Sequence, residues 1–174
     1  IQEFRDFYRA SASAPSGPYK AYVLKGLGAS DLRPVVETYL NRQGIAFGYA
    51  NGARTVQGYR YSDGTSGRVS VQPGDMVLSA RQPKSVLLRV LFEPQPSLSD
   101  SLTYDITSWA LPYVYGLEAY ALPATLEPDV TTLAPNAPVS PSLDQPYAYL
   151  VAWNNFEDAR FLAALLRQGI SPRY

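Results

Sequence analysis

The chain has 174 residues, 46% of them hydrophobic and 17% charged, which is enough apolar material to bury the core of a globular domain. Its 15 basic and 15 acidic residues cancel, so no nucleic-acid partner is expected, because proteins that bind nucleic-acid backbones normally carry a basic excess. With no histidine and no cysteine, the chain cannot hold a histidine-ligated zinc, a Ser–His–Asp relay, a thiol nucleophile or a disulfide. No apolar run approaches the ~20 residues that cross a bilayer, so no membrane partner is expected either.

Residues 1–18 predict a short helix followed by a linker. Ile1, Phe4 and Tyr8 recur at helical spacing, which indicates an amphipathic helix. Residues 11–18 are small, polar and proline-bearing, as linkers commonly are.

Residues 19–122 are expected to form one domain that begins with a β–α–β unit. Aromatic and β-branched side chains over residues 19–25 predict a strand. Apolar residues then follow a helical stripe over residues 32–40, and Gly44 is the expected glycine just after the helix. A second strand follows over residues 45–49. Because such units join parallel strands, we expect an α/β fold with a mostly parallel sheet flanked by helices.

Residues 51–80 predict a β-rich insertion in this domain. Gly, Ser and Asn separate short alternating runs, and the Gln-Pro-Gly-Asp turn at residues 72–75 would join residues 68–71 to 76–79 as a hairpin. A helix is expected next, on the helical spacing of Val86, Leu87, Val90 and Leu91.

The last part of the chain contains a linker and an internal repeat. Six prolines fall within residues 123–146, which indicates an extended linker. Residues 148–151 (Ala-Tyr-Leu-Val) echo the first strand, and residues 167–170 repeat the Arg-Gln-Gly-Ile of residues 42–45 letter for letter. We therefore expect residues 147–174 to start a second homologous β–α unit that the natural chain continues; the alternative is convergence, since apolar patterns of β–α units resemble one another.

Two patterns that could carry chemistry have simpler explanations. The Gly-Leu-Gly of residues 26–28 lies where a phosphate loop would, but Asp31 stands in place of the third glycine and would repel a phosphate. A carboxylate pair drawn from Asp100, Asp105 and Glu118 could hydrolyse glycosides, although helix capping and loop roles explain the two aspartates. No Gly-x-Ser-x-Gly elbow occurs. No catalytic residue is therefore predicted.

The 14 tyrosines and two tryptophans leave two interpretations open. They could form stacking platforms for sugar rings or peptides, or they could pack in the core with their hydroxyl groups at its rim. The candidates are Tyr59, Tyr61, Tyr104, Trp109, Tyr113, Tyr115 and Tyr120.

Two stretches carry a family resemblance. Residues 71–84 (VQPGDMVLSARQPK) and 100–116 (DSLTYDITSWALPYVYG) together resemble the region downstream of the catalytic domain in large secreted bacterial zinc carboxypeptidases of the carboxypeptidase A type. The resemblance spans about residues 1–174, and the second stretch is its specific part.

The resemblance implies a non-catalytic accessory domain rather than an enzyme. The zinc ligands and general base of that family lie in an upstream domain, so zinc is expected there and no cofactor in this chain. The fold implied is class I glutamine-amidotransferase-like, with flavodoxin-like as the related parallel arrangement, and the nucleophilic cysteine and histidine of the former are missing here. The expected partner is the catalytic domain of the same polypeptide, in a secreted or periplasmic bacterial protein.

The functional surface is expected within the resembling motifs, at Arg81, Gln82, Lys84, Asp105 and Trp109. These residues would pack on the catalytic domain or help to present peptide or cell-wall substrate; turn closure, capping and core packing are the structural alternative. An independent carbohydrate- or peptide-binding module that uses exposed Tyr and Trp is the alternative function.

Overall fold

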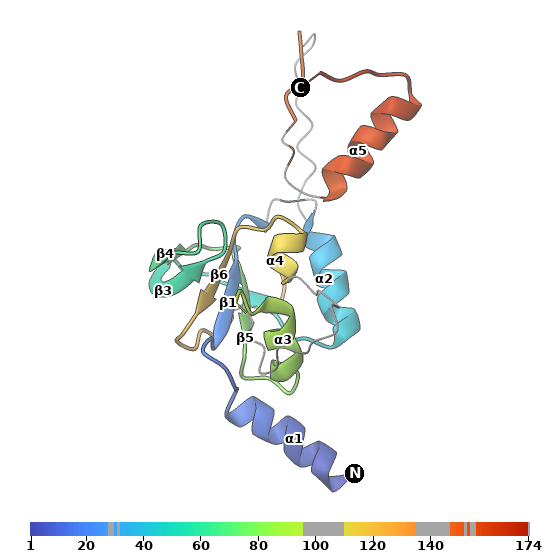
Figure 1. Cartoon of the computed structure of the whole chain (residues 1–174). Helices are drawn as coiled ribbons and strands as arrows, with labels where there is room; N and C mark the ends of the chain where they lie inside the picture. Colours follow the sequence, from blue (N-terminus) through green and yellow to red (C-terminus); the bar gives the residue numbers. More distant parts are fainter. Residues whose placement is uncertain are drawn as a thin grey trace.

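The computed structural model describes residues 1–27, 30, 32–95, 110–134, 147–151, 153 and 156–173, and within them six strands form one sheet in the order β2-β5-β1-β6-β3-β4 (Figure 1). The strands are β1 (Ala21–Leu24), β2 (Gly48–Tyr49), β3 (Arg54–Arg60), β4 (Ser66–Val71), β5 (Met76–Ser79) and β6 (Ala119–Leu122). The helices are α1 (Gln2–Ser13), α2 (Leu32–Gln43), α3 (Ser85–Phe92), α4 (Leu111–Val114) and α5 (Phe156–Arg167).

Every pairing between these strands is antiparallel, so the expected mostly parallel sheet, amidotransferase-like or flavodoxin-like, is wrong. Strand β1 pairs antiparallel with both β5 and β6, and β2 pairs antiparallel with β5. Strands β1 and β2 therefore run in the same direction, as the predicted β–α–β unit requires, but β5 lies between them. The crossover through α2 follows from local sequence, whereas β5 enters the sheet from further along the chain.

The strands of the expected β-rich insertion belong to this same sheet. Strand β3 pairs with β4 as a hairpin, from Tyr59 opposite Ser66 to Arg54 opposite Val71, and β3 also pairs with β6. The predicted hairpin between residues 68–71 and 76–79 is absent because β5 pairs with β1 and β2.

The turn predicted between β4 and β5 is confirmed. The Asp75 backbone N–H donates to the Gln72 carbonyl at 3.1 Å, and Gly74 has a φ of +89°. Proline at the second position and a glycine with positive φ at the third, as in Pro73-Gly74, are typical of a type II turn. The turn leads the chain from the edge strand β4 to the inner strand β5.

The core has two layers, one on each face of the sheet. Helices α2, α3 and α4 cover one face (Figure 1), where Tyr22 and Leu24 of β1 pack with Leu88 and Phe92 of α3. The intervening residue Val23 faces the other side, because successive side chains of a strand alternate. The second cluster is completed by Ala21, Ala50, Val69, Val71, Val77, Tyr120, Leu122 and Leu126.

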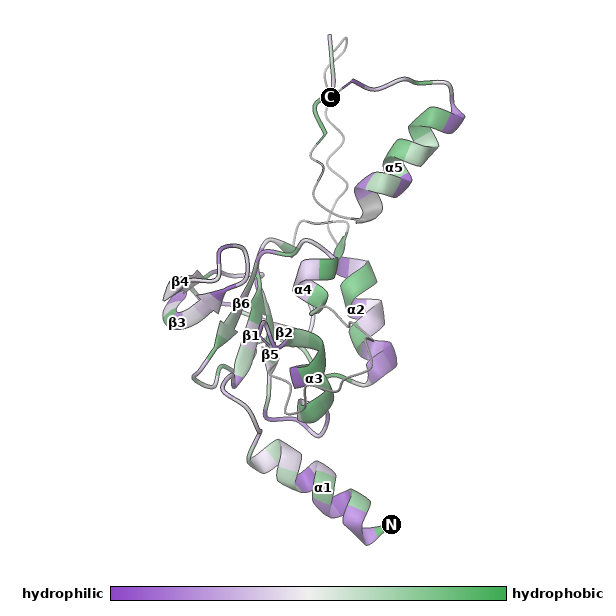
Figure 2. Cartoon of the chain, viewed as in Figure 1, coloured by the Kyte–Doolittle hydropathy of each residue, from purple (hydrophilic) through white to green (hydrophobic). Residues whose placement is uncertain are grey.

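Helix α3 turns a different stripe to the sheet from the one predicted. Leu88 and Phe92 are fully buried, whereas Val86 and Val90 are exposed. Figure 2 shows that α3 is hydrophobic along most of its length, so its sequence offers two apolar stripes. Packing against β1 selects the stripe that carries the larger phenylalanine.

Helices α1 and α5 stand apart from the sheet (Figure 1). The helix predicted at the start of the chain is confirmed as α1. Residues 147–151 form no strand and are exposed, although the repeat predicts one there. Among the described residues, no helix has the length and hydrophobicity to cross a membrane.

Candidate functional site

Gln82, from the first resembling stretch, is buried and bonded to backbone. Its side-chain Nε2 donates to the carbonyls of Ala46, at 3.0 Å, and Ser79, at 2.7 Å. Its Oε1 accepts from the backbone N–H of Ala46 at 2.7 Å. Gln82 thus links the end of β5 to the segment before β2, and both of its amide N–H groups are used within the fold.

Asp75, in the same stretch, forms an interior ion pair. Lys25 Nζ lies 3.1 Å from Asp75 Oδ2 and also donates to the Ser70 carbonyl at 2.5 Å. The same Asp75 oxygen accepts from the Gln72 backbone N–H at 2.8 Å. This carboxylate therefore fastens the β4–β5 turn to the end of β1.

The other predicted site residues are dispersed. Lys84 Nζ lies 5.5 Å from the centroid of the Tyr8 ring of α1, a cation–π contact. Arg81 is exposed, and its backbone N–H donates to Ser79 Oγ at 3.1 Å. Asp105 and Trp109 lie outside the described residues, as do Gly28, Asp31, Asp100 and Tyr104. Arg81, Gln82 and Lys84 thus have different surroundings among the described residues.

Helices α1 and α3 are in contact, and both carry exposed apolar side chains. Ser85 Oγ of α3 donates to the Ser11 carbonyl of α1 at 3.0 Å, and Ser11 is buried. On the two helices that meet here, Phe4 of α1 is 71% exposed and Val90 of α3 is 61% exposed. We call the exposed set the α1–α3 surface: Ile1, Phe4 and Phe7 of α1 with Val86 and Val90 of α3.

The aromatic rings of α1 are ordered against one another. The Tyr8 ring centroid lies 6.4 Å from that of Phe4 and 5.4 Å from that of Phe7. Lys84 holds Tyr8 from the α3 side. Exposed apolar clusters of this kind mark interaction sites more often than single exposed residues do. The helical spacing predicted this stripe but not its exposure.

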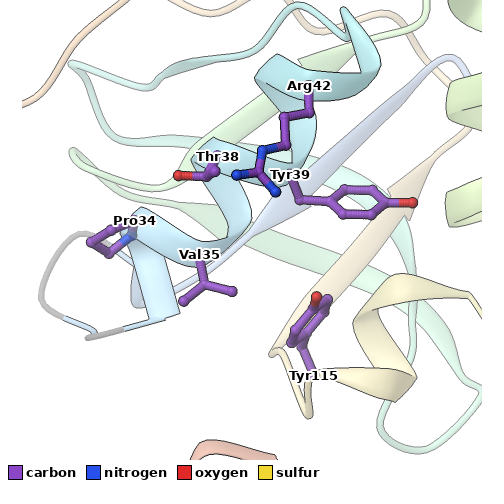
Figure 3. A pocket seen from close by; sticks show the side chains of 6 residues that line it. All are labelled: Pro34, Val35, Thr38, Tyr39, Arg42 and Tyr115. Carbon is purple, nitrogen blue, oxygen red and sulfur yellow. The ribbon is translucent and has the colours of Figure 1, made fainter.

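A second candidate is an open groove of about 430 Å³ between α2 and the turn after α4. Figure 3 shows Tyr39 and Tyr115 facing each other across it, with the Arg42 side chain extending over the same side of α2. The lining residues are Pro34, Val35, Thr38, Tyr39, Arg42 and Tyr115. Two tyrosine rings and a guanidinium suit a flat polar ligand, but the groove has no pair of groups for acid–base chemistry.

Five of the twelve described tyrosines are buried in the core. Tyr59, Tyr61 and Tyr120 are buried, so they are not stacking platforms. The Tyr61 hydroxyl donates to the Phe92 carbonyl, and burial raises the pKa of that hydroxyl well above its usual value. Burial, with a hydrogen bond to Tyr59, raises the pKa of Tyr113 to about 12.

These tyrosines predict a loss of stability in alkali. The pKa values of Tyr22 and Tyr61 are raised, chiefly by burial, above the value of about 10 expected in the unfolded chain. Their contribution is fully present below pH 10 and falls by about 1.4 kcal/mol per tyrosine for each pH unit above it. Urea unfolding at pH 9 and at pH 11 measures this slope. The Tyr22→Phe variant should show a slope lower by one tyrosine's share, and an unchanged slope would contradict the prediction.

Within the described residues, no cluster of three or more acidic, histidine or cysteine side chains could hold a metal ion. Glu118, the candidate carboxylate that the structure describes, accepts from the Tyr120 hydroxyl at 2.9 Å. Comparisons with protein-family models, with curated proteins and with solved structures find no match to this chain.

Proposed function

We propose that this chain is a non-catalytic accessory domain of an exported bacterial zinc carboxypeptidase-like protein, and that the α1–α3 surface docks on the catalytic domain of the same polypeptide. The observation that carries the proposal is the exposed aromatic face of α1, where Phe4 and Phe7 pack against Tyr8 and have no covering element among the described residues. The antiparallel sheet removes the amidotransferase-like part of the resemblance, so the proposal retains only the accessory role.

The internal use of the resembling motif agrees with this role. The side chains of Gln82 and Asp75 form hydrogen bonds with the backbone of Ala46 and Gln72, and Lys84 contacts Tyr8 of α1. In this role the motif stabilises the fold and orients α1. Burying one large apolar side chain stabilises a contact by about 1.5–3 kcal/mol, so Phe4 and Phe7 together could hold a docked domain.

The test has two steps. Sequencing the reading frame around this chain is expected to show an upstream domain with a His-x-x-Glu pair and a later histidine. In the polypeptide that joins both parts, the Phe4→Ser/Phe7→Ser double variant should release α1. Proteolysis within residues 14–18, just after α1, should then become at least about tenfold faster, the change that ~1.4 kcal/mol of lost docking produces. Val114→Ser, at a half-exposed position of α4, is the control and should leave the rate unchanged.

Each step can fail separately. An upstream region without that ligand set overturns the carboxypeptidase link. Equal proteolysis of the double variant and the Val114→Ser control overturns the docking role of α1, whatever the upstream domain is.

The groove at Tyr39 and Tyr115 favours a second candidate function, a carbohydrate- or peptide-binding module. Two tyrosine rings with Arg42 beside them could stack on a sugar ring or clasp an extended peptide. Titration calorimetry with oligosaccharides and peptides, comparing the chain with a Tyr39→Ala variant, distinguishes this function from an accessory scaffold.

A further inference from the structure

The internal repeat places the same residue pattern in opposite environments. In the first copy, β1 is fully buried between two neighbouring strands. In the second copy, Tyr149 is 71% exposed and Leu150 fully exposed. Residues 147–151, which are uncharged and have the sequence of a strand, are therefore exposed.

The helix of the second copy shows the same contrast. Val36 and Leu40 of α2 are buried against the sheet, whereas Phe161 of α5, at the position that matches Val36, is 47% exposed. Ile45 is buried after α2, and Ile170 is exposed after α5. We call the exposed set the C-terminal surface: Tyr147, Tyr149, Leu150, Val151, Trp153, Phe161, Leu166 and Ile170.

We propose that the C-terminal surface binds a second copy of this chain, with the two 147–153 segments paired antiparallel about a two-fold axis at Leu150. The segment contains no charge and no proline, so nothing in it opposes pairing with its own copy. The equivalent strand β1 has antiparallel neighbours on both sides. In this proposal the second copy takes the place that the predicted continuation of the β–α unit would fill, and the inference does not depend on the proposed function.

The side chains favour this register. With Leu150 opposite its own copy, Tyr149 lies opposite Val151 and Tyr147 opposite Trp153. Aromatic pairs with aromatic or β-branched residues are among the favourable cross-strand pairs, and the two-fold axis forms each of them twice. Because side chains alternate along a strand, these four residues share one face of the paired strands. If the pairing register shifted by one residue, the aromatic face of one segment would lie on the same side as the opposite face of the other.

The surface is large enough for a stable dimer. Tyr147, Tyr149, Trp153 and Phe161 are 106%, 71%, 63% and 47% exposed, so at roughly 200 Å² per ring they offer about 570 Å² per copy. The half- to fully exposed Leu150, Val151, Leu166 and Ile170 bring the C-terminal surface to at least the ~800 Å² that one partner contributes to a standard interface. That exceeds the largest apolar patch of a typical monomer, about 300–600 Å².

Disulfide trapping tests the register, since the chain contains no cysteine. A Leu150→Cys variant of the full chain should form a covalent dimer on mild oxidation, because the two sulfur atoms would face each other across the axis. The control is Ala148→Cys, whose two copies would lie about 13 Å apart along the strand, beyond disulfide reach. Equal crosslinking of the two variants would overturn the register.

Sedimentation equilibrium tests the association itself. The chain should be dimeric at micromolar concentration, and Leu150→Lys should raise the dissociation constant at least tenfold, because it sets two ammonium groups face to face. Ser62→Lys, in the exposed β3–β4 turn, is the control and should leave the constant unchanged. A wild-type chain that stays monomeric overturns the proposal, including a monomer whose 147–151 amides resist hydrogen exchange because the segment folds onto its own chain.

Discussion

Replacing Asp75 by alanine is expected to lower the free energy of unfolding by about 3–5 kcal/mol, because it leaves the Lys25 ammonium inside the fold without its carboxylate. The change also removes the acceptor of the Gln72 backbone N–H. The turn between β4 and β5 would then lose its tie to β1. Urea unfolding at pH 7 measures the effect.

Two controls separate the charge from the packing. The Lys25→Met/Asp75→Leu double variant should recover most of the stability, since an apolar pair of similar volume replaces a buried ion pair at little cost. Asp6→Ala breaks the surface pair with Arg9 and should produce no measurable change. If Asp75→Ala lowered the free energy of unfolding by less than the Lys25→Met/Asp75→Leu double variant did, the ion pair would have no structural role.

The second large effect is expected for Gln82→Ala, a loss of about 2–4 kcal/mol in the free energy of unfolding. The substitution removes three hydrogen bonds and leaves the Ala46 N–H and two carbonyls without partners. Each buried polar group left unpaired costs about 1–3 kcal/mol, although water can reach part of this site. Hydrogen exchange at the Ala46 amide should accelerate in parallel.

Arg81→Ala is the matched control, since the neighbouring Arg81 side chain is exposed and its removal should leave stability unchanged. A Gln82→Ala variant of wild-type stability would contradict the structural role and return Gln82 to the predicted functional surface.

The expectations for the candidate site depended on contacts that the sequence does not display. Gln82 lies in a motif that resembles a family's accessory region, but its role depends on Ala46, which is brought near only when β2 and β5 pair. The exposure of Val86 and Val90 depends on which stripe of α3 meets the sheet. Either stripe satisfies the helical spacing, so periodicity could not choose between them.

Local signals by themselves determined α1, α2 with its terminal glycine at φ +67°, and the type II turn at residues 72–75, because each depends on residues adjacent in the chain. They also determined that the strands before and after α2 share a direction. Only the tertiary structure decided that β5 lies between those strands and makes the sheet antiparallel. Strands β1 and β5 are buried on both faces, and such uniformly apolar segments fit a parallel or an antiparallel neighbour equally well. The choice then depends on which distant strand completes the core.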